Sequence, residues 1–442
     1  MILDGAPAAT ISAGDTAWTL VSAGLVLLMI PGLALFYGGL VRARAALNTF
    51  MMSFAALALV SVQWVIGGYS LAFAPGAGAT GDLRWAGLAA LGATGPYSAT
   101  IPHVAFVAFQ AMFAGITVAL ISGAMVERIR FQTYLIFAVL WTTLVYDPLA
   151  HWVWGDGGWL RALGALDFAG GTVVHVSAGT AALVAAIVLG ERHDRGRTAL
   201  VPHNVPFTLV GAGLLWVGWF GFNAGSALAA DGVAANALVT THAAASSALV
   251  VWLLLDLRRT GQATAVGAAT GAVVGLVAIT PAAGYVTPLA ALAIGACGAV
   301  ASYYAIQLRN RTRIDDALDV FACHGVAGIV GALLTGVFAQ KVVNPAGADG
   351  LLAGNARQLG VQALAVLCTI AFAAPVTFGI LRVLSVRRIR VPMPLELSGI
   401  DVSEHGEHAY HHGETLGIAD GAITVGQPVI LEPQEDEELH AA

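Results

Sequence analysis

The chain has 442 residues, a formal net charge of −6 and a mean hydropathy of +0.79. Hydrophobic residues make up 58% of it and Asp, Glu, Lys and Arg only 10%, whereas a soluble domain carries about 25% charged residues. The composition therefore excludes most soluble classes and predicts a polytopic membrane protein embedded in the lipid bilayer. With only 20 Lys and Arg residues in total, the chain shows no sign of a nucleic-acid partner.

The first stretch, Met1–Asp15, lacks the basic residues and the cleavage site of a secretory signal, so we expect no removable signal peptide. About eleven apolar segments of spanning length follow, since about twenty apolar residues cross a hydrocarbon core of roughly 30 Å. They run approximately over residues 17–40, 46–74, 103–126, 132–151, 169–190, 205–227, 235–256, 262–280, 286–308, 317–340 and 356–384. The sequence lacks the alternating ten-residue segments that a β-barrel requires, so we predict an all-α membrane protein.

Basic residues follow every odd-numbered segment and are sparse elsewhere. Those after odd segments are Arg42, Arg44, Arg128, Arg130, Arg192, Arg195, Arg197, Arg258, Arg259, Arg309, Arg311, Arg313, Arg382, Arg387, Arg388 and Arg390. The other connections hold only Arg84, Arg161, Lys341 and Arg357. By the positive-inside rule, this alternation predicts that the N-terminus lies outside and the C-terminus lies in the cytoplasm.

An internal repeat divides the membrane domain. Segment one contains TLVSAGL at Thr19–Leu25, and segment six contains TLVGAGL at Thr208–Leu214. Because each repeat holds five segments, an odd number, the two repeats must have opposite orientations, an architecture typical of transporters. We therefore predict an inverted 5+5 repeat plus one extra helix. The expected divisions are an extracytoplasmic segment 1–15, a membrane domain 16–385 (repeats at about 16–190 and 205–340, extra helix at about 356–384) and a cytoplasmic tail 386–442, disordered after about 415.

Segments five and ten share a motif that places a histidine inside an apolar helix. Asp167–Gly179 reads DFAGGTVVHVSAG and Asp316–Gly328 reads DALDVFACHGVAG, so each Asp precedes a His by eight residues. Ionisable residues within a membrane are costly and usually functional, and a neutral histidine is the least costly of them. A single such histidine is more often a helix-packing group. The matched pair, His175 and His324, instead predicts one site built from both repeats.

Six motifs, in order along the chain, resemble the ammonium transporter family (Amt/Mep/Rh), on its Amt side. They are IPGLALFYGGLVR (Ile30–Arg42), VERIRF (Val126–Phe131), DFAGGTVVH (Asp167–His175), WVGWFGFNAGSA (Trp216–Ala227), CHGVAGIVGALLTG (Cys323–Gly336) and GIDVSEHGEHAY (Gly399–Tyr410). The resemblance extends from about residue 16 to Tyr410. It implies a homotrimer in which each subunit has its own narrow hydrophobic pore for ammonium or ammonia.

The resemblance also implies which residues act along that pore. They are Phe113, Trp154, Ser226 and Asp167 for an outer cation site, Phe113, Phe222 and Trp219 for a gate of stacked phenyl rings and its neighbour, and His175 and His324 for the pore itself. Ammonium is close to potassium in size, so selection must use its N–H donors and its attraction to aromatic faces, worth about 0.5–2 kcal/mol. A serine hydroxyl adds an acceptor. Without this context, aromatic residues near a membrane surface are interfacial anchors.

Two carboxylates precede the histidine helices. Asp167 lies one turn before its helix, where a carboxylate accepts backbone N–H groups as an N-cap. We expect it both to cap that helix and to favour a cation. Asp316 is expected to play the symmetric structural part at the cytoplasmic end, where Arg311 and Arg313 are its predicted partners.

The tail after Arg390 is polar and acidic. The resemblance implies that its piece Gly399–Tyr410 lies on the cytoplasmic face and couples neighbouring subunits. It also implies that this face receives a PII-type signalling protein that blocks the pores. The residues assigned to this regulatory segment are Gly399, Asp401, His405, Gly406 and Tyr410. Four arginines are expected to ring the pore exits beneath it: Arg128, Arg195, Arg258 and Arg311.

The sequence thus predicts a multi-pass transport protein for ammonium or ammonia in the plasma or inner membrane, acting in nitrogen uptake. It leaves open whether ammonium, ammonia, or ammonia plus a proton crosses. We expect no cofactor and no metal, because the three cysteines lie in apolar runs as small hydrophobic residues and the tail histidines have no cysteine partner. Two acids near the outer vestibule, Asp147 and Asp156, have no assigned role.

Three other functions compete with transport. An ammonium sensor is disfavoured because such proteins carry an appended signalling domain, which does not fit in the roughly 50 residues after segment eleven. A neutral gas channel of the Rh type is the nearest alternative within the family. A membrane metalloenzyme is disfavoured because no Glu-x-x-His pair occurs within a segment.

Overall fold

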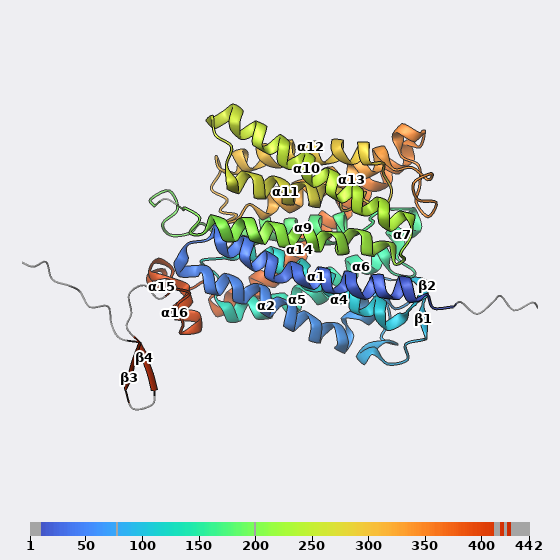
Figure 1. Ribbon diagram of the computed structural model, residues 1–442. Helices are drawn as coiled ribbons and strands as arrows, with labels where there is room; N and C mark the ends of the chain where they lie inside the picture. Colours follow the sequence, from blue (N-terminus) through green and yellow to red (C-terminus); the bar gives the residue numbers. More distant parts are fainter. Residues whose placement is uncertain (1–9, 77, 199, 411–415, 420–421, 426–442) are drawn as a thin grey trace, which may run out of the picture.

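The computed structural model describes residues 10–76, 78–198, 200–410, 416–419 and 422–425, and its long helices run side by side between two ends of the molecule (Figure 1). The α-helices are α1 (Ala13–Leu40), α2 (Ala46–Gln63), α3 (Tyr69–Phe73), α4 (His103–Met125), α5 (Phe131–Trp141), α6 (Asp147–Trp154), α7 (Trp159–Leu163), α8 (Ser177–Leu189), α9 (Val205–Ala224), α10 (Gly232–Thr260), α11 (Ala265–Ile279), α12 (Pro288–Arg309), α13 (Ala327–Phe338), α14 (Ala356–Leu384), α15 (Met393–Ser398) and α16 (Ile400–His405). The π-helical turns are η2 (Trp64–Gly68), η4 (Thr142–Tyr146), η5 (Gly171–Val176) and η7 (Phe321–Val326). The short 3-10 helices are η1 (Ala43–Ala45), η3 (Ala86–Leu88), η6 (Gly225–Ala227), η8 (Leu351–Ala353) and η9 (Ser385–Arg387).

Among the described residues, ten helices are long and apolar enough to cross a membrane. Predicted segment eight corresponds to α11, which is apolar but only 15 residues long. Predicted segment four is a broken helix, since α5, η4, α6 and α7 together cover Phe131–Leu163. The predicted helical membrane architecture is therefore confirmed, whereas the count of eleven, the inverted repeat and the orientation stay predictions.

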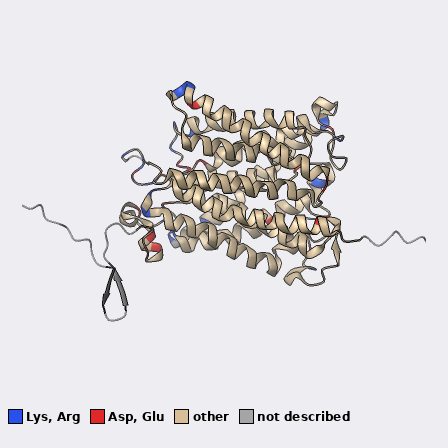
Figure 2. Cartoon of the chain, in the orientation of Figure 1, with Lys and Arg blue, Asp and Glu red and all other residues tan. Residues whose placement is uncertain are grey.

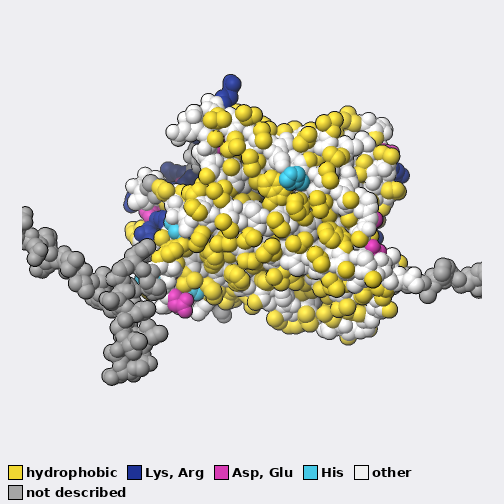
Figure 3. Space-filling view, viewed as in Figure 1, with side chains coloured by type: hydrophobic (Ala, Val, Ile, Leu, Met, Phe, Trp, Pro, Cys, Tyr) yellow, Lys and Arg dark blue, Asp and Glu magenta, His cyan; other side chains and the backbone are white. Residues whose placement is uncertain are grey.

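The surface has the layering of a membrane protein. Charged residues gather at the two ends of the molecule, and the middle is almost free of them (Figure 2). Hydrophobic side chains cover the face between these ends (Figure 3). Large apolar side chains exposed on the long helices include Leu20 of α1 and Val239 and Leu254 of α10. An apolar belt of this extent suits contact with lipid or with other membrane helices.

Elements that correspond in the predicted repeat pack against one another. α1 lies along α9, and α8 packs on η7 as α13 packs on η5. The glycines that end the two histidine motifs, Gly179 and Gly328, permit this approach. A Cβ at Gly179 would lie 2.2 Å from the backbone nitrogen of Gly325, and a Cβ at Gly328 would lie 3.0 Å from the carbonyl oxygen of Gly171. Small residues at such crossings let membrane helices pack closely, and the reciprocal arrangement is what an inverted repeat would produce.

The two ends of the molecule carry different elements. One end holds α15, α16 and the loops that follow α1, α4, α8, α10 and α12, and we call it the arginine-rich end. The other holds β1 (Thr94–Gly95), β2 (Ser98–Pro102), α7 and the start of α1 (Figure 1), and we call it the vestibule end. The predicted disorder after about residue 415 falls mostly outside the described residues. Within them, β3 (Leu416–Ala419) and β4 (Ala422–Val425) form an antiparallel hairpin.

Candidate functional site

The two histidines of the repeated motif meet inside the protein. His175 is in η5 and His324 is in η7, and their side chains are buried. Their Nδ1 atoms are 3.3 Å apart, and the rings are inclined by only 23°. A hydrogen bond between two Nδ1 atoms requires one ring to donate and the other to accept, so neither Nε2 is used in this pairing. The Nε2 of His175 has no partner among the described residues.

Both histidines lie in π-helical turns. The N–H of His175 donates to the carbonyl oxygen of Gly170, five residues earlier, at 3.0 Å. Such turns are rare, insert an extra residue into a helix and occur frequently at functional sites. Here they shift each ring out of regular helical register at the point where η5 and η7 contact one another.

A small apolar cavity lies beside the two histidines. It has a volume of about 10 Å³, roughly the space of a single water molecule. Its lining residues are Met29, Leu33, Phe36, Ile116, Leu120, Val174, His175, Leu215, Trp219, Phe222, Val273 and His324. The two histidines and the Trp219 indole are the only polar side chains in this lining, so the cavity offers a poor environment for a bare cation.

Two phenyl rings close this cavity toward the vestibule end. The rings of Phe113 and Phe222 are stacked with centroids 4.1 Å apart and an angle of 16° between them, and both side chains are fully buried. Trp219 does not join the stack. Its ring lies along that of His175 at 5.4 Å, and its Nε1 donates to the Thr280 hydroxyl at 2.9 Å. The structure therefore places Trp219 beside the histidine, beyond the two phenyl rings.

A larger cavity of about 620 Å³ opens on the other side of the phenyl rings, and Phe113, Trp154, Asp167 and Ser226 all line it. The Trp154 ring stands edge-on to that of Phe113 at 6.3 Å, and its Nε1 donates to the Asp167 carbonyl oxygen at 2.8 Å. The Ser226 hydroxyl donates to the Phe222 carbonyl oxygen at 2.8 Å, so its lone pairs are available as acceptors. The residues assigned to an outer cation site thus surround one vestibule.

The Asp167 carboxylate accepts four backbone N–H groups at the start of η5. Oδ1 accepts from Gly170 and Gly171 at 2.8 and 2.6 Å, and Oδ2 accepts from Thr172 and Val173 at 2.8 and 3.0 Å. Burial raises the pKa of this carboxyl, and the four N–H donors oppose that shift. The carboxylate is therefore fully engaged in capping the helix, at a residue that lines the vestibule.

Asp316 is buried like Asp167 but makes fewer bonds. Its Oδ2 accepts the N–H of Phe321 at 2.7 Å, and Oδ1 has no partner among the described residues. The prediction that Arg311 or Arg313 pairs with it is wrong, since neither makes an ion pair with it. The paired acids of this loop are Asp315 and Asp319.

A family model described as the Ammonium Transporter Family matches residues 17–410. The chain belongs to this family. An ammonium transporter of Bacillus subtilis (strain 168) is 50% identical over 400 residues, which are 90% of this chain and 98% of that one. The crystal structure of Mep2 from Candida albicans superposes with a TM-score of 0.83 at 37% identity, covering 90% of each chain. A structure described as "Sensor Amt Protein" gives 0.81 at 30% identity, covering 89% of this chain and 98% of that one.

Membership in the Ammonium Transporter Family confirms the resemblance stated above, makes the chain a multi-pass membrane transporter and supports ammonium as its substrate. In this family member a further cavity lies on the side of the histidines that faces the arginine-rich end. This cavity of about 310 Å³ is lined by His324, Cys323, Tyr37, Asp319 and Asp256, among others, and by loops of the arginine-rich end. We call it the inner cavity.

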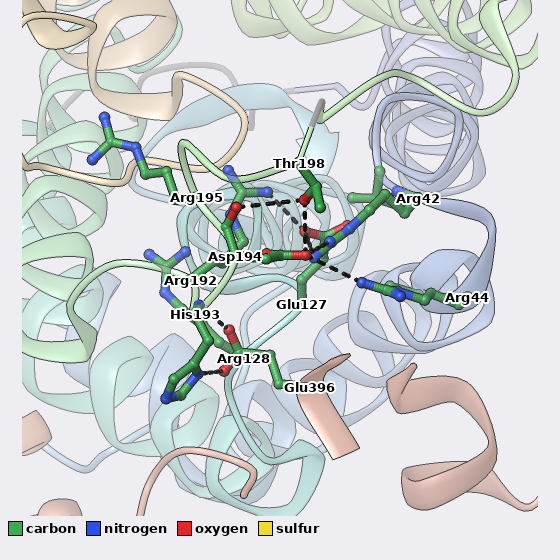
Figure 4. Close-up of polar contacts among 12 residues, drawn as sticks. Arg42, Arg44, Glu127, Arg128, Arg192, His193, Asp194, Arg195, Thr198 and Glu396 are labelled. Carbon is green, nitrogen blue, oxygen red and sulfur yellow. Dashed lines mark hydrogen bonds and ion pairs between the residues drawn. The ribbon is translucent and has the colours of Figure 1, made fainter. Parts of the chain in front are cut away.

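A buried ion cluster joins the loops of the arginine-rich end (Figure 4). Glu127 accepts from Arg42 and Arg192, each at 2.8 Å, and Asp315 accepts from Arg192 at 2.9 Å and Arg128 at 3.4 Å. Burial raises the pKa of the Glu127 carboxyl, but the hydrogen bonds and positive charges of Arg42 and Arg192 outweigh burial and lower it. Because the partners come from the loops after α1, α4, α8 and α12, the cluster ties both halves of the chain together.

Two of the arginines predicted to ring the pore exits are engaged within the protein. Arg128 is fully buried, and besides its ion pair it donates to the carbonyl oxygens of Ala124 and Asp315 at 2.7 and 2.5 Å. Arg195 pairs with Glu191 at 2.8 Å. The prediction is wrong for Arg128, which has no surface to offer a regulator. Arg258 and Arg311 are exposed.

The regulatory segment lies against the membrane domain of the same chain. Asp401 accepts the N–H groups of Leu47 and Asn48 at 3.1 and 2.8 Å and so caps the start of α2. His405 Nε2 lies 2.9 Å from the Asn48 side-chain oxygen, and the Tyr410 hydroxyl lies 2.8 Å from His203 Nε2.

Two glycines shape the segment that carries these contacts. Gly399 has φ +123° and Gly406 has φ +71°, and a Cβ at Gly399 would lie 2.7 Å from that of Arg44. Glycine tolerates both conformations.

The sequence analysis gave no role to two buried acids, Glu396 and Asp147. Glu396 accepts from Arg390 and from the N–H of His193, and it fastens α15 to the loop after α8. The signal was available, because Glu396 is the only acid in the run from Val391 to Ser398. Asp147, which had no role, is buried and accepts from the Gln63 amide at 2.7 Å. Nothing in the local sequence identifies that partner, which lies 84 residues away.

Proposed function

We propose that this protein carries ammonium across the membrane as ammonia and a proton that travel separately and recombine. The observation that carries the proposal is the pair His175 and His324, hydrogen-bonded to one another at the wall of a cavity of about 10 Å³. A cavity so small and apolar would strip a cation of water at a cost of many kcal/mol. Neutral ammonia avoids that cost, and imidazole rings can hold the proton.

Recruitment takes place in the outer vestibule. Trp154 and Phe113 present aromatic rings, and Ser226 presents a hydroxyl acceptor, to a cavity wide enough for a hydrated cation. Cation–π attraction and one hydrogen bond favour ammonium over water at this point. The Asp167 carboxylate contributes negative potential from its capping position at the start of η5. The stacked rings of Phe113 and Phe222 then admit only a species without its hydration shell.

The histidine pair handles the proton. Ammonium loses a proton at the phenyl stack, so an N–H bond breaks and ammonia enters the small cavity. The proton is taken up by an imidazole Nε2 of the pair, which becomes an imidazolium shared through the Nδ1 contact of 3.3 Å. Proton and ammonia leave on the inner side, where His324 also lines the inner cavity. Net transfer therefore carries one positive charge.

The vestibule end faces the cell exterior and the arginine-rich end faces the cytoplasm, in the plasma or inner membrane, where the protein serves nitrogen uptake. The distribution of arginines supports this orientation. The two halves of the membrane domain form an inverted repeat, and this domain ends near residue 385, where the cytoplasmic tail begins. On the cytoplasmic face, the segment Gly399–Tyr410, with its contacts to α2, is the part available to a PII-type protein.

The protein works as a homotrimer, and one residue on its apolar face supports subunit contact. His242 is exposed on α10, eleven residues into a helix of 29, beside the rings of Trp216 at 5.4 Å and Phe220 at 6.3 Å of α9. The Trp216 Nε1 is buried without a partner among the described residues. Ionisable side chains at such depth rarely face lipid, so a second copy covering α9 and α10 would shield both groups.

Uptake of radiolabelled methylammonium into proteoliposomes tests transport directly. We expect uptake that ammonium inhibits and potassium does not, and Ser226→Ala should weaken that inhibition. A sensor, the role named for one structural relative, would bind the substrate without net uptake. A neutral channel of the Rh type would give uptake that carries no charge.

A further inference from the structure

The inner cavity has an acidic lining. Among the described residues that line its volume of about 310 Å³, Asp319 and Asp256 are the only Asp, Glu, Lys or Arg residues. His324 lines this cavity and also the small pore cavity on the other side. A group in the wall of the inner cavity therefore shares a compartment with the inner histidine of the pore.

Asp319 offers one free carboxylate oxygen to that compartment. Arg309 donates from Nε and Nη2 to the same oxygen, Oδ1, at 3.0 and 2.6 Å. The other oxygen, Oδ2, accepts no hydrogen bond from any described residue. The Asp319 side chain is 23% exposed, so water in the cavity can reach it. Arginine usually bonds both oxygens of a carboxylate, and this one-sided pairing leaves the second for another partner.

The backbone holds Asp319 in an uncommon conformation. Its φ is +57°, in the left-handed region that few residues other than glycine adopt. Its N–H donates to the Asp316 carbonyl oxygen at 3.3 Å, and its own carbonyl accepts the N–H of Cys323 at 2.9 Å. These bonds fix the turn directly before η7. Such local strain is common at functional sites, and here it sets a carboxylate at the base of the helix that carries His324.

We propose that Asp319 is the proton-exchange residue at the inner mouth of the pore. The inference rests on the proposed function, in which ammonia and the proton cross separately. The proton held by the histidine pair moves through water in the inner cavity to Oδ2 of Asp319, which becomes neutral. Ammonia leaving the pore takes that proton: the O–H bond breaks, an N–H bond forms, and ammonium and the carboxylate result. Arg309 stabilises the carboxylate again.

The surroundings of Asp319 suit both protonation states. The titratable groups around it are Arg309 and Tyr303 from α12, Asp256 from α10, Tyr37 from α1, Arg192 from the loop after α8, Asp316 from its own loop, and Cys323 and His324 from η7. Burial raises the pKa of the Asp319 carboxyl to about 7, and the positive charge of Arg309 opposes that shift. The residue precedes the membrane-capable helix Phe321–Phe338. A group with such a pKa exchanges protons efficiently near neutral pH.

Ammonium-evoked current in proteoliposomes, recorded while the pH on the arginine-rich side is varied, tests the inference. The wild-type current should change with a midpoint near the pKa of about 7. Asp319→Asn keeps an oxygen for Arg309 but cannot exchange a proton, so its current should fall about tenfold or more and lose that midpoint. Arg309→Gln removes the charge that lowers the pKa, so the midpoint should move to higher pH.

The matched control is Asp256→Asn. It removes the other acid of the lining, whose Oδ2 accepts the Thr264 hydroxyl at 2.7 Å, and it should keep the wild-type midpoint. A wild-type current and midpoint in Asp319→Asn would overturn the inference while leaving the proposed function intact. A wild-type protein without ammonium-evoked current would overturn both. If Asp319→Asn does not assemble, Arg309→Gln decides, and an unchanged midpoint in it overturns the inference.

Discussion

Replacement of Asp167 by alanine removes the acceptor for four backbone N–H groups at the start of η5. A buried donor without a partner costs about 1–3 kcal/mol, so at the lower bound the four together cost about 4 kcal/mol. Asp167→Asn keeps one acceptor oxygen and with it two of the four bonds, so its loss should be about 2 kcal/mol. Thermal unfolding in detergent, followed by tryptophan fluorescence, measures the order wild type, Asn, Ala. Amide hydrogen exchange over residues 168–176 should rise in the same order.

Asp316 provides the matched control, because it occupies the equivalent place before η7 but accepts the N–H of Phe321 alone at 2.7 Å. Asp316→Ala should therefore lose only about 1 kcal/mol. Equal melting temperatures for wild type and Asp167→Ala would refute the capping role. Transport separates the two roles of the residue, since Asp167→Asn should recover stability more than activity. Normal transport by the Asn variant would show that the negative charge is unnecessary.

The remaining predictions concern the pore, the tail and the ion cluster. His175→Ala and His324→Ala should each change the ammonium-evoked current or its selectivity over potassium in assembled protein, and unchanged values in both would rule out a shared site. Truncation after Val391 should leave a trimer in the membrane with reduced transport, since α2 loses the cap that Asp401 provides. The truncated protein should not bind a PII-type protein in a pull-down, and wild-type binding would show that docking lies elsewhere. Glu127→Ala leaves the buried Arg192 and the partly buried Arg42 without their shared partner, so the melting temperature should fall by the equivalent of about 3 kcal/mol. A normal melting temperature would contradict the importance of the cluster.

Much of the architecture was predictable because a bilayer restricts what a sequence can do. Apolar length identifies membrane helices, and arginine placement predicts their orientation, without any tertiary information. The repeated Asp-to-His spacing was sufficient to predict that His175 and His324 lie together, and their Nδ1 atoms are 3.3 Å apart. The stacked pair Phe113 and Phe222, by contrast, followed only from family resemblance, since phenylalanine is common in any membrane helix.

What the sequence could not give is the partner of each buried charge. Asp315, Asp316 and Asp319 lie within five residues, yet they bond Arg192, a backbone N–H and Arg309 respectively. Their choice depends on loops that meet only in the folded protein. Arg128 was misplaced for the same reason, because arginine after a membrane segment normally lies in solvent, and only the structure reveals the carbonyl oxygens that hold it. The π-helical turns were likewise not predicted, since no residue pattern in the sequence marks the extra residue in each turn.

The charge carried with each substrate is the quantity that most directly tests the central claim. Purified protein in liposomes adsorbed to a solid-supported electrode should give a transient positive current into the vesicles on a jump in ammonium concentration, and none on an equal jump in potassium. Uptake and current should both depend on His175 and His324. Uptake of substrate without current would contradict separate passage of ammonia and a proton and would indicate a neutral gas channel instead.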